Sequence, residues 1–179
     1  MSQINNWRRC FIFSDVIKGV LTFLFVFSAS GCAKGSNDYN AGDLRAINHV
    51  NGIAINGFSV NGYGATGLGG GVCCVMLPRK WIPGLKAHVE WEVDPNTAPP
   101  FPGYKDRNKF NAWKKQTEAS FQKHSAIVDI PKYSETCGMT VHFLPCNQVK
   151  VTTSCVGYGT PDYPIKEPLD MKEPAQCPR

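Results

Sequence analysis

The sequence predicts a mainly β domain, either sandwich-like or a strongly bent antiparallel sheet, with one short helix and stabilising disulfides. Three observations predict it: short apolar segments between Gly, Pro and Asn-Gly turns, a two-residue alternation along Lys86–Val93, and six cysteines downstream of an export signal. We expect a signal peptide at 1–31, a lipidated tether at 32–46, and a single β-rich domain with a proline-rich tail at 47–179.

The N-terminus has the pattern of a bacterial lipoprotein signal. Arg8, Arg9 and Lys18 precede the apolar run VLTFLFVF at 20–27, which is too short for a membrane-spanning helix. Small residues then lead to Cys32, whose thiol we predict to carry the lipid. An ordinary secretory peptide that ends near a cysteine is the alternative. Ala33 and Lys34 follow Cys32 where an inner-membrane retention signal has Asp, which favours the periplasmic side of the outer membrane.

The charge balance argues against a nucleic-acid partner. Without residues 1–31 the chain holds 16 basic and 13 acidic residues, a formal charge of +3. Nucleic-acid binding needs a clustered basic face, whereas here only short pairs such as Lys114-Lys115 occur. We interpret these pairs as solvated surface.

The even number of cysteines in an exported chain predicts up to three disulfides. If Gly138–Pro145 is an extended strand, the cysteines at its two ends lie about 30 Å apart and do not pair with each other. Adjacent residues of a strand point to opposite faces, so the two neighbouring cysteines are expected to have different partners. A zinc site is the alternative, but no C-x-x-C or H-x-x-x-H spacing occurs. The six cysteines are Cys73, Cys74, Cys137, Cys146, Cys155 and Cys177.

Asn-Gly pairs open the predicted domain, at 51–52, 56–57 and 61–62. They indicate either short hairpins or one longer strand with bulges. The glycine-rich Gly62–Gly71 contains a formal G-x-G-x-x-G, but no helix signal follows, so we interpret it as a mobile loop rather than a nucleotide site. The apolar Val72–Leu77 is typical of a buried strand.

In the second half of the chain, one segment changes to helical spacing. Asp94–Tyr104 has four prolines and predicts a surface loop, and Asp106–Lys123 predicts a helix. We expect its stripe of Phe110, Trp113, Thr117 and Phe121 to pack on the sheet. Further strands are predicted at 126–130, 140–144 and 148–153, and the tail from 160 to 179 is expected to wrap the surface, with Cys177 holding it.

No catalytic motif stands out. His88 shares a strand face with Glu90 and Glu92, which suits a metal or acid–base chemistry, but a solvated sheet face has the same pattern and we prefer that interpretation. His142 is interpreted as structural or surface-lying. No G-x-S-x-G elbow is present, and oxidised cysteines are poor nucleophiles. We therefore expect a protein that is not an enzyme and that has neither a metal nor a cofactor.

Several phrases together resemble a known family. These are GFSVNG at 57–62, CCVMLP at 73–78 with WIPG at 81–84, VEW at 89–91, IPKY at 130–133 and VHFLPC at 141–146. In order and spacing, over most of 48–165, they are similar to a family of proteobacterial exported proteins known only as a domain of unknown function. Its members are often lipoproteins encoded beside type VI secretion spike proteins and phospholipase effectors.

The resemblance implies an immunity role, in which a membrane-anchored lipoprotein holds a cognate phospholipase effector inactive in the periplasm. It supplies no catalytic residues. On general grounds of interface composition, the partner-binding candidates are Tyr63, Phe101 and Tyr104. Two other classes stay open: a structural or envelope-assembly lipoprotein without a toxin partner, and a hydrolase or metal-dependent enzyme built on His88.

Overall fold

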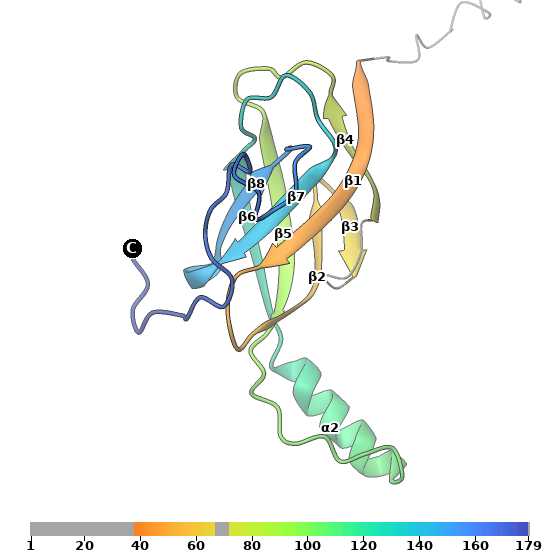
Figure 1. Cartoon of the computed structure of the whole chain (residues 1–179). Coiled ribbons are helices and arrows are strands. Elements are labelled where there is room, and N and C mark those ends of the chain that lie inside the picture. Colours follow the sequence, from red (N-terminus) through yellow and green to blue (C-terminus); the bar gives the residue numbers. More distant parts are fainter. Residues whose placement is uncertain (1–37, 67–71, 179) are drawn as a thin grey trace, which may run out of the picture. The chain divides into compact units, whose positions relative to one another are not determined.

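Two four-stranded β-sheets make up most of the fold in a computed structural model that describes residues 38–66 and 72–178 (Figure 1). The predicted signal peptide and Cys32 lie outside these residues. No helix within them is long and apolar enough to cross a membrane. The elements are β1 Tyr39–Asn48, β2 Ala54–Val60, β3 Tyr63–Thr66, β4 Val72–Pro78, β5 Lys86–Asp94, α2 Arg107–Ala119, β6 Gln122–Asp129, β7 Met139–Leu144, the 3₁₀ turn η1 Pro145–Asn147 and β8 Gln148–Thr152.

The two sheets have different pairing patterns. The first sheet has the order β4-β1-β7-β8, in which β1 runs parallel to β7 and the other pairs are antiparallel. The second sheet has the order β3-β2-β5-β6 and is antiparallel throughout. The mainly β class is therefore confirmed, with two sheets rather than one bent sheet and with one α-helix among residues 38–66 and 72–178.

The core lies between the sheets and follows from the alternation of the strands. On β5, every second residue is buried: Ala87, Val89, Trp91 and Val93. From the first sheet, Phe143 meets Trp91 with ring centroids 5.6 Å apart. Burying one such large side chain contributes about 1.5–3 kcal/mol, so the strands that alternate most regularly hold the two sheets together.

β1 corrects the predicted organisation. The sequence predicts a flexible tether to residue 46, yet β1 begins at Tyr39 and Leu44 is only 1% exposed. The run YNAGDL is polar and glycine-bearing, but its hydrogen-bonding partners, β4 and β7, are distant in the sequence. The folded domain therefore begins well before residue 47.

The Asn-Gly pairs have more than one role. Asn61 and Gly62 both have positive φ, at 51° and 83°, and form the two-residue turn between β2 and β3. The pair at 56–57 lies at a register shift within β2. The predicted glycine-rich loop is thus strand β3 as far as Thr66, and residues 67–71 lie outside the described part of the chain.

Two backbones approach each other closely where β1 meets the start of β7. A Cβ built on Gly138, which has φ +100°, would lie 2.2 Å from the carbonyl oxygen of Asp43. A Cβ on Gly42 would lie 2.5 Å from the Cα of Gly138. Only glycine fits at either position, and this contact allows β1 to run beside β7.

The helix is shorter than predicted and is packed differently. α2 ends at Ala119, and residues from Gln122 onward form β6 rather than the end of a helix. The expectation that its aromatic stripe packs on the sheet is wrong, because no residue of α2 is buried and the helix projects from one end of the sandwich (Figure 1). The stripe instead contacts the proline-rich loop after β5.

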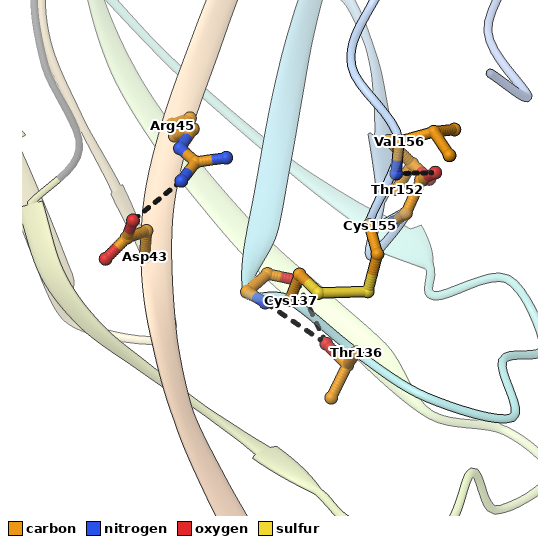
Figure 2. The surroundings of a disulfide bond; sticks show 9 residues. Asp43, Arg45, Thr136, Cys137, Thr152, Cys155 and Val156 are labelled. Carbon is orange, nitrogen blue, oxygen red and sulfur yellow. Dashed lines mark hydrogen bonds and ion pairs between the residues drawn. A yellow bond between two sulfur atoms is a disulfide. The ribbon is translucent and has the colours of Figure 1, made fainter.

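The described cysteines form three pairs. Cys137 joins Cys155 beside β1, with Cα atoms 5.0 Å apart (Figure 2). Cys146 joins Cys177, with Cα atoms 5.4 Å apart, so the prediction that Cys137 and Cys146 do not pair is confirmed. The sulfur atoms of the neighbouring pair Cys73–Cys74 lie against each other. Different partners for those two were expected, and this is wrong because the other four cysteines pair among themselves.

The C-terminal tail covers the outer face of the first sheet, as predicted. Tyr163 and Ile165 are buried there, at 3% and 7% exposure. The backbone of Met171 makes two hydrogen bonds with the segment after β1. Its N–H donates to the carbonyl of His49 (2.7 Å), and its carbonyl accepts from the N–H of Asn51 (2.8 Å). With the Cys146–Cys177 disulfide, these contacts hold the tail in place.

Candidate functional site

The predicted His88 constellation lies on an open sheet face. His88, Glu90 and Glu92 alternate with the core residues of β5 and point outward. Glu90 accepts a hydrogen bond from the Ser59 hydroxyl (3.2 Å), and Glu92 lies opposite Lys123 in the register. In the described ranges, the one group of three side chains close enough to share a metal ion is Cys146, Glu173 and Cys177, where two sulfurs are already joined.

Phe101 and Tyr104 belong to an aromatic cluster with α2. Phe101 lies 5.0 Å from Trp113 between ring centroids, and Tyr104 lies 5.5 Å from Phe110. The indole N–H of Trp113 donates to the carbonyl of Pro99 (2.8 Å), which fixes the loop beside the helix. We call residues 95–121 the α2 appendage. The third predicted partner-binding residue, Tyr63, is not part of this appendage, because it lies on β3, where it pairs with Val60 of β2.

Local sequence explains how the appendage forms. Asp106 caps the helix, because its Oδ1 accepts from the backbone N–H groups of Asn108 (3.0 Å) and Lys109 (3.1 Å). The four prolines of the preceding loop restrict it to extended conformations, so it lies alongside the helix rather than continuing it. The cluster gives a marginal 13-residue helix the tertiary contacts that it needs.

The loop and the helix enclose an apolar groove of about 490 Å³. Much of its aromatic surface stays in contact with solvent, since Phe101 is 48% exposed and Tyr104 is 79% exposed. Such a contiguous exposed apolar surface is typical of an interaction site rather than of ordinary monomer surface. The groove is lined by Phe101, Tyr104, Phe110, Trp113, Lys114, Thr117, Glu118 and Phe121.

A second polar feature is buried under the tail. His49 and His142 are both fully buried, and the His49 Nε2 and His142 Nδ1 atoms lie 2.7 Å apart. His49 Nδ1 lies 2.8 Å from the Pro168 carbonyl, and His142 Nε2 lies 2.7 Å from the Tyr163 hydroxyl. A carbonyl only accepts, so for neutral rings the proton positions are fixed: Tyr163 donates to His142, His142 donates to His49, and His49 donates to Pro168.

This chain of hydrogen bonds favours neutral groups. Burial and, to a smaller extent, the neighbouring His49 lower the pKa of His142 to about 4, while Glu167 acts in the opposite direction. Burial also raises the pKa of Tyr163. The chain of hydrogen bonds is closed at both ends by protein groups, so it suits a structural role that joins the tail to β7.

Of the two roles predicted for His142, structural or surface-lying, its complete burial favours the structural one. Nothing in the sequence indicates that His49 is its partner. The two histidines are 93 residues apart, and no local spacing signals that they meet. Likewise, the sequence places Phe110, Trp113 and Phe121 on one stripe but gives no sign that the stripe faces a loop and solvent.

Comparison with known protein families also identifies a domain of unknown function in this chain. A family model described as a protein of unknown function, DUF3304, matches residues 47–151. Searches of the curated proteins and of the solved structures returned no match. The matched segment runs from the end of β1 to β8 and includes the α2 appendage and both buried histidines. Because it covers more than half of the chain, the protein belongs to the DUF3304 family of unknown function.

Proposed function

We propose that this protein is a lipid-anchored periplasmic immunity protein that binds and inhibits a type VI secretion phospholipase effector. The observation that carries the proposal is the exposed aromatic groove of the α2 appendage, presented at the end of a disulfide-bonded sandwich. A rigid scaffold with an exposed aromatic surface is what an inhibitor of another protein needs. The resemblance described above supplies the kind of partner.

The position of the appendage is consistent with anchoring at Cys32. β1 starts at the end of the sandwich opposite α2 (Figure 1). Six residues, 33–38, separate Cys32 from β1 and span at most about 20 Å when fully extended. An upright domain would therefore hold the groove away from its own membrane, open to an incoming protein. Tethering also raises the effective concentration of the inhibitor at the surface that a phospholipase attacks.

Co-production in a bacterial periplasm tests the proposal. The full-length chain with its own leader is produced together with each phospholipase that the same genome encodes beside type VI spike genes, exported to the periplasm. We expect one phospholipase to lose its toxicity, to release less free fatty acid and to co-purify with the detergent-solubilised chain. Survival unchanged with every such phospholipase, and no co-purification, would refute the proposal and favour the envelope-assembly alternative.

The lipid anchor is tested separately. Radiolabelled palmitate should enter the wild-type chain and be absent from a Cys32→Ser variant, with Cys10→Ser as the matched control that keeps the label. Protection by Cys32→Ser should fall in cells, while affinity for the phospholipase in detergent stays unchanged. Label retained in Cys32→Ser would contradict the assignment of the lipidated residue.

A further inference from the structure

The α2 appendage differs in charge from the rest of the described chain. Residues 95–121 contain five basic and two acidic side chains, a formal charge of +3. The other described residues contain nine basic and eleven acidic side chains, a formal charge of −2. The domain is therefore polarised, and its net positive charge lies on the element that carries the apolar groove.

Few of these cations are neutralised within the chain. Lys109 lies 3.9 Å from Asp106 and Lys114 lies 3.7 Å from Glu118, both as exposed pairs that contribute little. Across the described residues, no carboxylate lies within ion-pair distance of Lys105, Arg107 or Lys115. The appendage thus combines an apolar groove with three basic side chains that have no ion-pair partner in the described part of the chain.

The shape of the surface separates two kinds of occupant. A helix that lies on a bilayer inserts a convex apolar face between lipid headgroups. Here the loop that carries Phe101 and Tyr104 stands beside the helix, so the apolar residues line a hollow instead. A hollow of this size accepts protruding side chains, and the net positive charge of the appendage attracts carboxylates placed around them.

We propose that the α2 appendage is the partner-binding element of this protein, and that it recognises an acidic protein surface whose apolar protrusion fills the groove. This inference rests on the proposed function for the identity of that protein as a phospholipase, and it specifies the chemistry of the contact. Phe101 and Tyr104 form the wall that closes on the protrusion. Arg107 and Lys115 steer the acidic surface of the partner toward the appendage.

Two double variants of the α2 appendage, each with a matched control, test this inference in the full-length chain. The measurement is the affinity of each variant for the phospholipase that the wild type protects against. Phe101→Ala with Tyr104→Ala removes the groove wall and should raise the dissociation constant roughly 30-fold or more, as for aromatic residues at interface centres. Its control, Ile127→Ser with Leu169→Ser, changes apolar side chains that are 69% and 51% exposed elsewhere, and should leave affinity unchanged.

The charge variants report on a different step. Arg107→Glu with Lys115→Glu should slow association by about tenfold at low salt, and the difference should shrink at high salt. Lys132→Glu with Lys172→Glu makes the same charge change on exposed residues outside the appendage and should slow association much less. Every variant should be folded, because no residue of α2 belongs to the core. Circular dichroism and the melting temperature check this.

The outcomes separate the inference from the proposed function. If the wild type binds the phospholipase and the appendage variants bind as tightly, the inference is wrong and the proposed function stands. If the wild type binds no phospholipase, both fall. If the wild type binds phosphatidylglycerol vesicles but not phosphatidylcholine vesicles, and Phe101→Ala with Tyr104→Ala abolishes that binding while leaving protein affinity unchanged, the occupant is a membrane and the inference is overturned.

Discussion

Acidification should destabilise the fold through His142. Its pKa is about 4 in the folded protein because of burial and the neighbouring His49, whereas an unfolded chain gives histidine a pKa near 6.5. Between these two values the unfolded state binds a proton that the native state excludes. The contribution of His142 to stability is therefore fully present above pH 6.5 and is lost as the pH falls toward 4.

The size of the effect follows from the two pKa values. A shift of this extent corresponds to about 3 kcal/mol between pH 7 and pH 4, of which roughly 2 kcal/mol is already lost at pH 5. That loss is a large part of the stability of an ordinary domain. Other groups also titrate in this range, so the prediction concerns the difference between the wild type and a variant without the imidazole.

Urea unfolding at pH 7, 6, 5 and 4 with the disulfides oxidised measures this difference. A His142→Gln variant keeps a hydrogen-bonding side chain but does not titrate, so its free energy of unfolding should fall about 3 kcal/mol less than that of the wild type. His88→Gln, on the exposed face of β5, is the matched control and should follow the wild type. Parallel curves for the wild type and His142→Gln would refute the assignment of the effect to the buried pair.

Three other predictions concern stability. Gly138→Ala places a Cβ 2.2 Å from the β1 backbone and should lower the melting temperature by the equivalent of more than about 2 kcal/mol. Gly157→Ala, which has open space around it, should leave the melting temperature unchanged. Equal melting temperatures for the two variants would contradict the steric argument. Removing the Cys146–Cys177 disulfide by a double serine substitution should lower the free energy of unfolding in urea by about 3–4 kcal/mol and expose the tail to trypsin. A tail that still resists cleavage would show that its other contacts hold it in place. Asp106→Ala removes the helix cap and should speed hydrogen exchange in 107–119 without changing the melting temperature, and a lower melting temperature would show that α2 supports the core.

Features whose evidence is local in the sequence were predictable. The alternation along β5 identifies its buried face residue by residue, and the turn after β7 is marked by Pro145. Asp106 marks the start of α2, although the predicted helix runs too far because the polar residues around Lys123 suit an exposed edge strand as well as a helix. These elements depend on periodicity and capping, which neighbouring residues supply.

Features that depend on distant partners were not predictable. β1 is stabilised by pairing with β4 and β7 on its two sides, so its own polar sequence looks like a tether. The helical stripe of α2 shows which residues share a face but not what covers that face. The meeting of His49 with His142 needs the tertiary fold, and so does the pairing of Cys73 with Cys74 rather than with distant cysteines.

The inner position of β1 has a mechanical consequence. This strand is the segment nearest to the proposed lipid anchor, and it is hydrogen-bonded along both edges rather than along one. A pull on its N-terminal end, applied while a partner holds the far end of the sandwich, loads these bonds in shear, so that many must break together instead of one after another. If the proposed lipid is attached at Cys32, the domain is joined to it through one of its most resistant elements, as the proposed function of holding a partner at a membrane requires.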